Sequence, residues 1–168
     1  MKLESYKCKN LSDLPPHWGQ VVQLPKGEPM FESEILSYWD GIASFQMDGE
    51  AGIGWFELSR RPFRGNEVEC HTATQEALLC FQGDAICLVG EPVAPDQVTP
   101  SSFRPYCIEA GEGFIFAPGT WHALPFPLTH KAVFWVLFKK GTPQQDLHVL
   151  NLEEKCGFNF ELQLNNGE

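Results

Sequence analysis

Residues 111–126 read GEGFIFAPGTWHALPF and carry the strongest signals for the fold of this chain. A glycine turn precedes the apolar run FIFA, and a second turn at Pro118-Gly119 separates it from a further apolar run that contains His122. Short aromatic and aliphatic runs between glycine and proline turns favour strands over helices. The stretch therefore predicts an all-β protein, and it raises the question of what a histidine does among apolar residues.

The same pattern continues on both sides of this stretch. The runs EALLCF (76–81) and AICLVG (85–90) are joined by a tight turn at Gly83, which predicts a β-hairpin. The runs FRPYCIEA (103–110) and FIFA (114–117) repeat this arrangement. Several short strands with glycine turns are typical of a sandwich, a jelly roll or a small barrel with a cavity near one mouth.

Two runs near the C-terminus complete the β pattern. KAVFWVLFKK (131–140) carries apolar residues on both faces, which predicts either a strand buried on both sides or a core strand of a closed sheet. GFNFELQL (157–164) alternates apolar and polar residues, as an outer strand does. Helices are expected only as short segments near residues 10–14 and 144–147, and the proline-rich segment 91–102 is expected to be a surface loop between strands.

Length and composition predict a single domain over residues 1–168, because this length suffices for one sizeable core but not for two ordinary ones. Twelve basic against 22 acidic residues give a net charge of -10 without an evident basic patch, so neither nucleic acid nor an anionic membrane is an expected partner. The N-terminus MKLESYKCKN lacks the apolar core of a signal peptide, and no run approaches the ~20 apolar residues of a membrane span. We therefore expect a cytoplasmic protein.

The cysteines are expected to be buried thiols. They form no CxxC pair, and most lie in or beside apolar runs, where a small apolar side chain fits better than a disulfide or a zinc ligand. The six are Cys8, Cys70, Cys80, Cys87, Cys107 and Cys156.

Three polar residues at the edges of apolar runs are candidates for a functional site. His71 and His122 each fit two interpretations, a hydrogen-bonded core histidine or a site residue. Glu76 opens the run EALLCF, where an unpaired carboxylate is costly to bury, so it is expected to meet a metal, an arginine or solvent.

Arginines supply candidates for anion binding. Arg104, flanked by aromatic residues in FRPYC, either pairs with an acidic residue of the protein or holds a substrate carboxylate through its bidentate fork. Arg60 and Arg61 are similar candidates.

The histidines and Glu76 lie in two stretches that resemble the two sequence motifs of the cupin superfamily. The first motif runs Gly, five residues, His-x-His, three or four residues, Glu, six residues, Gly, and the second contains Pro-x-Gly, two residues, His. Ala73 stands where the superfamily has its second histidine. The resemblance implies a cupin-type double-stranded β-helix, or jelly-roll barrel. The residues that match by type are Gly65, His71, Glu76, Gly83, Pro118, Gly119 and His122.

Within the cupins the chain is most similar to the ureidoglycolate lyase family, over roughly residues 55–138. Members show a Glu-x-x-His-x-x-x-x-Gln block, a later Arg-Ala-Phe strand, and a Gly-x-x-Gly turn that leads to a Trp-His pair close before a proline. The corresponding residues here are Glu69, His71, Gln75-Glu76, Phe103-Arg104-Pro105-Tyr106, Gly111-Glu112-Gly113, Trp121-His122 and Pro125.

The resemblance implies elimination of urea from (S)-ureidoglycolate to give glyoxylate, a step of allantoin and purine degradation. A divalent ion (Ni, Mn, Zn or Fe) would be held by His71, His122 and either Gln75 or Glu76, and would polarise the substrate hydroxyl. Arg104 would hold the carboxylate of this small substrate, and without metal one of the two histidines would act as general base. The resemblance also implies a homodimer.

Two other classes of function fit the same residues. One is a non-catalytic cupin that binds a small molecule, in which Ala73 marks a lost metal site. The other is a cupin enzyme of different chemistry, such as an isomerase or a dioxygenase. Stoichiometric metal with turnover distinguishes the lyase from the binding protein, and iron with oxygen uptake would mark the dioxygenase.

Overall fold

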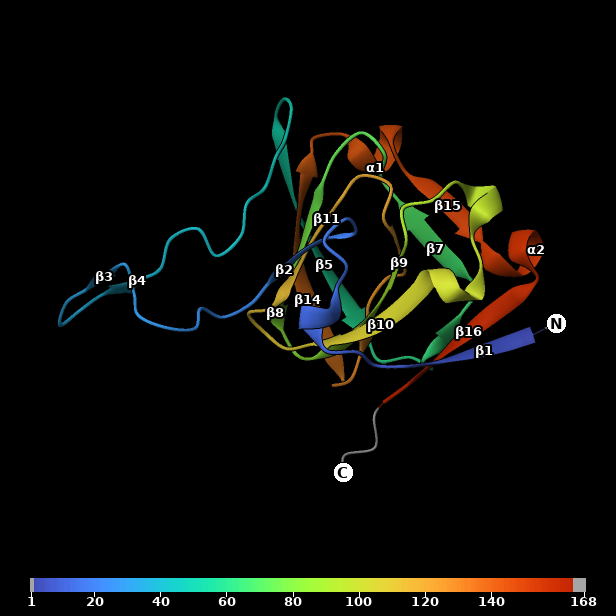
Figure 1. Cartoon of the computed structure of the whole chain (residues 1–168), viewed down its shortest axis with the longest axis horizontal. Helices are drawn as coiled ribbons and strands as arrows, with labels where there is room; N and C mark the ends of the chain where they lie inside the picture. The colour runs from blue at the N-terminus through green and yellow to red at the C-terminus, as the bar shows by residue number, and fades with distance from the viewer. Residues whose placement is uncertain (1, 165–168) are drawn as a thin grey trace.

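The computed structural model describes residues 2–164 and places most of its strands in three sheets, with a two-stranded arm beside them (Figure 1). The outer sheet runs in the order β2 (Gly19–Val22), β11 (Gly113–Phe116), β8 (Glu76–Gln82), β14 (Lys131–Lys139) and β5 (Ala51–Ser59). The central sheet runs in the order β10 (Phe103–Ile108), β9 (Ala85–Gly90), β12 (Trp121–His122), β7 (Glu67–Cys70) and β15 (His148–Asn151), with β13 (Phe126–Pro127) also paired to β9. The small sheet runs in the order β1 (Lys2–Lys7), β16 (Phe158–Gln163) and β6 (Arg64–Gly65). The expected all-β class is confirmed.

Two hydrophobic cores hold the sheets together, one on each face of the central sheet. All residues of β9 are buried, with Ile86 and Leu88 in the core shared with the small sheet, and Cys87 and Val89 in the core shared with the outer sheet. Neighbouring residues of a strand point to opposite faces, so an uninterrupted apolar run such as AICLVG needs cover on both. The outer sheet covers one face of β9, and the small sheet covers the other.

The tight turns carry the chain from one sheet to another and do not form hairpins. β8 lies in the outer sheet and β9 in the central sheet, while β10 lies in the central sheet and β11 in the outer sheet. Both predicted hairpins are therefore wrong. Each run has an apolar face, and placing successive runs in opposite sheets lets these faces pack across a shared core, as Leu78, Val89 and Phe114 do. This alternation of successive strands between two packed sheets is the expected jelly-roll arrangement.

Two strand expectations need correction in detail. β14 pairs with β5 and β8 as a core strand should, but it is not fully buried on both faces, since Phe134 is fully buried while Trp135 is 40% exposed. Of the two alternatives, full burial on both sides is therefore wrong, whereas β14 does lie inside its sheet, between β8 and β5. β16 alternates as expected, yet it lies in the middle of the small sheet, paired with both β1 and β6.

The helices are short, as expected. The 3-10 helix η1 (Leu11–Asp13) lies within residues 10–14, and α1 (Thr142–Gln145) overlaps residues 144–147. Helix α2 (Leu152–Cys156) was not expected; the side chain of Asn151 caps its start by accepting a hydrogen bond from the Glu154 N–H. The loop 91–102 contains two further 3-10 turns, η2 (Pro95–Gln97) and η3 (Pro100–Ser102). None of the helices in the described residues has the length and apolar character that crossing a bilayer requires.

The segment 23–50 forms an arm that projects from the sheets (Figure 1). It connects β2 and β5, the two edge strands of the outer sheet, and its own strands β3 (Phe31–Glu32) and β4 (Ser37–Tyr38) pair only with each other. At its base the Gln20 side chain donates to the Ser44 carbonyl, and the Gln46 N–H donates to the Gln75 side chain at 2.6 Å. The base of the arm is therefore fixed to the body beside Glu76.

The small sheet is expected to contribute fully to stability. Phe160 of β16 is 1% exposed and packs edge-on against Phe126 of the central sheet, with ring centroids 5.9 Å apart. Phe160→Ala should lower the free energy of unfolding by about 3–5 kcal/mol, because it removes a buried ring and leaves a cavity. Glu161→Ala, on the opposite face of β16, is the control and should change this value by no more than about 0.5 kcal/mol in urea unfolding. Equally small losses for both variants would contradict the layered packing.

Candidate metal site

Four polar side chains from three strands meet between the outer and central sheets. Glu69 lies in β7 and His71 follows directly after that strand, and because alternate residues of an extended chain share a face, both point toward the outer sheet. His122 of β12 lies beside Glu69 in the strand register. Glu76 opens β8 of the outer sheet and completes the group from the opposite side.

The group is compact. The Nε2 atom of His71 lies 3.0 Å from Oε2 of Glu76, and Nε2 of His122 lies 3.3 Å from the same oxygen and 3.7 Å from Oε1 of Glu69. Ligand atoms of Glu69, His71 and His122 all lie within 4.8 Å of one another. The Glu69 side chain is 26% exposed, whereas those of the other three residues are 5–7% exposed. Glu69 is therefore the member of the group that solvent or a substrate reaches most easily.

Main-chain carbonyls fix both imidazole rings. Nδ1 of His71 lies 2.7 Å from the carbonyl oxygen of Asp146, and Nδ1 of His122 lies 3.0 Å from that of Thr120. A carbonyl oxygen only accepts, so each Nδ1 must carry the proton and donate. In the neutral ring the Nε2 lone pair then points into the group, which is the orientation a metal ligand requires.

The charges within the group shift its pKa values in opposite directions. Burial favours neutral forms, but the charge of Glu76, aided by Glu69, outweighs burial and raises the pKa of His122 to about 10. Burial also opposes ionisation of Glu76, yet attraction to His122 and His71 lowers the pKa of this carboxyl to about 2. The pKa of His71 is raised, because its pairing with Glu76 exceeds the effect of burial. Without a cation, protons on the imidazoles neutralise the carboxylates.

Two buried atoms of the group lack hydrogen bonds. Oε2 of Glu76 and Nε2 of His122 are shielded from solvent, and neither makes a hydrogen bond of acceptable geometry despite their separation of 3.3 Å. Buried polar atoms without partners are costly, and a cation placed among the four side chains would satisfy both. Two imidazoles with carboxylates suit Mn, Fe, Ni or Zn, and do not discriminate among these ions. The residues fit a divalent metal.

Glu69 is a candidate ligand that the sequence analysis left out of its metal set. Counted through Glu69, the first motif reads Glu69-x-His71, four residues, Glu76, six residues, Gly83, which is the superfamily spacing with a glutamate in place of the first histidine. Ala73 is exposed, and its N–H donates to the Asp146 side chain at 2.8 Å, so it does not stand at a ligand position. The expectation that a ligand is missing at Ala73 is therefore wrong. The motif begins two residues earlier, so Glu69 takes the place of its first histidine and His71 that of its second.

Two other predicted residues lie apart from this group. The Gln75 side chain accepts the hydrogen bond from Gln46 at the base of the arm and is not drawn into the cluster. Arg104 lies on β10, separated from His122 by strand β9, and its guanidinium carbon is 5.1 Å from the centre of the Trp18 ring. The ring accounts for the position of Arg104 at this edge of the sheet.

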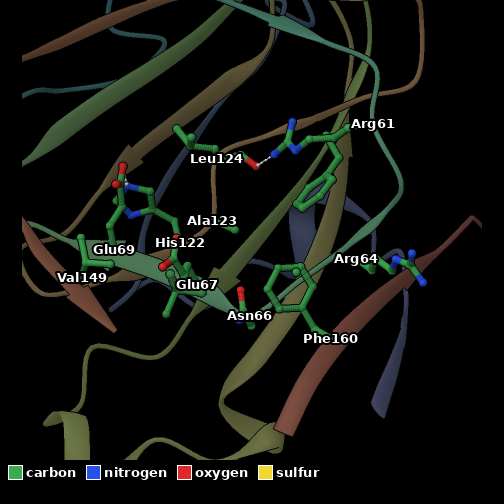
Figure 2. Close-up of a pocket in the computed structure, with 13 residues that line it drawn as sticks. Arg61, Arg64, Asn66, Glu67, Glu69, His122, Ala123, Leu124, Val149 and Phe160 are labelled. Carbon is green, nitrogen blue, oxygen red and sulfur yellow. Dashed lines mark hydrogen bonds and ion pairs between the residues drawn. The ribbon is translucent and has the colours of Figure 1, made fainter. Parts of the chain in front are cut away.

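A cavity of about 280 Å³ leads away from the metal-site residues (Figure 2). Glu69 and His122 line one end of it, and Arg61 lies at another end, as Figure 2 shows. The remaining lining residues are Arg64, Gly65, Asn66, Glu67, Val68, Ala123, Leu124, Phe126, Val149 and Phe160.

Arg61 is held rigidly at the cavity. Its guanidinium carbon lies 3.9 Å from the centre of the Phe126 ring, and its terminal nitrogens donate to the carbonyl oxygens of Leu124 and Pro125, both at 2.7 Å. Further N–H groups of the five in a guanidinium stay available for a ligand. Arg60 instead donates to the Leu128 carbonyl and does not line the cavity.

Comparison with solved structures places the fold among known proteins. The 3,4-ketoisomerase QdtA of Thermoanaerobacterium thermosaccharolyticum matches with a TM-score of 0.50 and 13% identity, over 76% of this chain and 84% of that chain. Oxalate decarboxylases of Bacillus subtilis (TM-score 0.41, 16% identity) and Lactobacillus farciminis (0.43, 15%) match over 63% of this chain. The chain spans only about a quarter of their length, 25% and 28% respectively. The expected cupin-type barrel is confirmed.

Sequence comparison identifies the family. No curated protein sequence matches the chain significantly. A family model described as ureidoglycolate lyase matches residues 32–159, which include the four metal-site residues, Arg61 and most of the arm. The match covers well over half of the chain, so the chain belongs to the ureidoglycolate lyase family.

Proposed function

We propose that the protein releases urea from (S)-ureidoglycolate and leaves glyoxylate. The observation that carries this proposal is one cavity lined both by Glu69 and His122 of the metal-site group and by the positioned Arg61. The substrate presents a carboxylate for the arginine, and a hydroxyl and a leaving nitrogen for the group at the other end. The family match supports the same reaction.

The reaction requires proton movements that the described side chains can perform. The hydroxyl proton must leave as the carbon–nitrogen bond breaks, and the departing urea nitrogen must gain a proton, so the two transfers balance. Glu69 lines the cavity and is the most exposed carboxylate of the group, so we assign it the role of accepting the hydroxyl proton and returning one to the nitrogen. A divalent ion held by His71, His122 and Glu76 would supply Lewis acidity at the hydroxyl.

Arg61 is proposed as the anchor for the substrate carboxylate. Stacking on Phe126 and two hydrogen bonds to main-chain carbonyls hold its guanidinium in one orientation, so little entropy is lost when a carboxylate binds. Arg104, the anchor predicted from the sequence, stacks near Trp18 and does not line this cavity. The proposal therefore transfers the anchoring role to Arg61.

We also propose that the protein is a homodimer, and two exposed apolar surfaces support this. The outward face of the outer sheet exposes Ile53, Trp55, Phe81 and Trp135 by 40–67%. The arm exposes a second set, Leu24, Met30, Phe31, Ile35, Leu36, Tyr38 and Ile42, by 48–95%. Contiguous apolar patches of this kind mark interaction sites. In a two-fold dimer the arm of each copy can cover the sheet of the other, so a single contact type buries both surfaces.

Metal content and turnover test the proposed function. The purified protein should bind about one divalent ion per chain and release glyoxylate and urea in equal amounts from (S)-ureidoglycolate. His122→Ala should lower metal affinity at least tenfold and lower kcat/KM by roughly 100-fold or more, because it removes a ligand from a site that needs its electrophile. Elemental analysis, calorimetric metal titration and a coupled glyoxylate assay measure these quantities.

His17→Ala, which changes an exposed histidine outside the cluster, is the control and should retain both metal and activity. One metal ion per chain without release of urea would support the metal site and reject ureidoglycolate as the substrate. Absence of both from the wild type would favour a binding protein without catalysis.

Arg61→Lys separates anchoring from chemistry. Lysine keeps the charge but loses the planar fork, so KM for ureidoglycolate should rise by roughly 10-fold or more while metal content stays at the wild-type level. Arg104→Lys is the matched control and should leave KM within about twofold. The reverse ranking of the two variants in steady-state kinetics would return the anchoring role to Arg104.

The dimer is tested by its mass in solution. Light scattering after size-exclusion chromatography should give twice the chain mass of 18.9 kDa. Trp135→Glu places a charge in the exposed apolar face and should shift the species toward 18.9 kDa, because an unpaired charge is costly to bury in an interface. Leu147→Glu, outside the outer sheet and the arm, should leave the mass unchanged. A monomeric wild type would reject the dimer.

A further inference from the structure

Two cysteines from distant parts of the chain meet at the junction of the small and central sheets. Cys8 directly follows β1, and Cys107 lies in β10, 99 residues further along the chain. Their Sγ atoms are 2.6 Å apart. The backbones run side by side at this point, because the Lys9 N–H donates to the Pro105 carbonyl at 2.8 Å and Lys9 pairs with Tyr106 in a parallel bridge.

This geometry is close to that of a disulfide. The sulfur atoms need to approach by only about 0.5 Å to reach the bond length of about 2.05 Å. We propose that Cys8 and Cys107 form a reversible disulfide, a modification site separate from the metal site.

The pair is accessible to a small oxidant. A surface hollow of about 540 Å³ is lined by both cysteines and by Lys9, Lys26 and Gln23, among others. Cys107 is partly exposed, whereas Cys8 is buried, so reagents meet Cys107 first. The contact with Cys8 lowers the pKa of Cys107 and outweighs burial, and the same contact, with burial, raises the pKa of Cys8. The lowered pKa suits Cys107 as the attacking thiolate.

Oxidation by a low-molecular-weight disulfide such as oxidised glutathione follows a balanced sequence. The Cys107 thiolate attacks one sulfur of the reagent, which forms a mixed disulfide and releases one glutathione thiolate. The Cys8 sulfur loses its proton and attacks the Cys107 sulfur, which forms the internal disulfide and releases the second glutathione. Two protein thiols are oxidised and one reagent disulfide is reduced to two thiols.

The crosslink would tie the first strand of the chain to the central sheet. β1 lies at the edge of the small sheet and pairs there with β16, and β16 contributes Phe160 to the wall of the substrate cavity. A bond across a 99-residue separation restricts the unfolded chain strongly. The oxidised form should therefore hold the small sheet more firmly against the central sheet.

Mass spectrometry of the full chain treated with oxidised glutathione tests the proposal. The wild type should lose about 2 Da, the mass of two hydrogen atoms, and denatured thiol counts should fall from six to four. Peptide mapping without reductant should join the peptides that contain Cys8 and Cys107. The thermal unfolding midpoint should rise by roughly 5 °C or more and return on reduction.

Two variants complete the design. Cys107→Ser should abolish the 2 Da loss and the shift in unfolding midpoint, whereas Cys156→Ser, which changes a partly buried cysteine in α2, should keep both. If Cys107→Ser does not fold, the wild-type peptide map alone decides. A wild type that retains six thiols, keeps a glutathione adduct, or links other cysteines would overturn the proposal.

Discussion

A carboxylate buried between two imidazoles is the constraint on which this structure depends. Glu76 belongs to the outer sheet, while His71 and His122 belong to the central sheet, so their contacts of 3.0 and 3.3 Å join the two layers at the mouth of the barrel. Main-chain carbonyls hold both rings by Nδ1, so both Nε2 atoms face Glu76, and that of His122 also faces Glu69. The negative charge of the carboxylates must be neutralised either by protons on the imidazoles or by a cation. Metal binding therefore displaces protons from these rings. The same four side chains therefore join the two sheets and form the candidate metal site.

The strands could be predicted from the sequence because glycine and proline turns separate apolar runs with β-forming residues. Their partners could not, since a tight turn specifies where the chain reverses and not which sheet receives the next strand. The turn at Gly83 has a φ of +80°, and an added Cβ there would lie 2.5 Å from the Lys131 carbonyl oxygen, so the turn is packed against β14 and not free at a hairpin tip. The run AICLVG did contain the missing information, because continuous apolar character requires cover on both faces. A hairpin strand with one face exposed to solvent would instead alternate apolar and polar residues.

The site could be predicted in part for a related reason. His71, Glu76 and His122 follow from motif spacing, and the structure brings all three together. Glu69 was missed as a member of the site because the motif was counted from Gly65, which put the expected second ligand at the exposed Ala73. Spacing measured backward from Gly83 through Glu76 identifies Glu69 without any structure. The arginine was different: flanking aromatic residues suggested Arg104, but only the tertiary packing of Phe126 shows that Arg61 is the arginine fixed at the cavity.

Charge distribution explains why such a cavity needs a fixed arginine. The chain carries a net charge of -10, and Glu67 and Glu69 both line the cavity, so an anionic substrate meets repulsion from the whole protein and from the site itself. Arg61 and Arg64 are the cations of the cavity lining, and Arg61 is the one held by both a ring and two carbonyls. In the proposed reaction, a carboxylate bound at Arg61 would place the rest of a small substrate toward Glu69 and His122, which also line the cavity. On this proposal the arginine selects the orientation of the substrate as well as its charge, and Glu69, the proposed proton acceptor, meets the end of the molecule that must react.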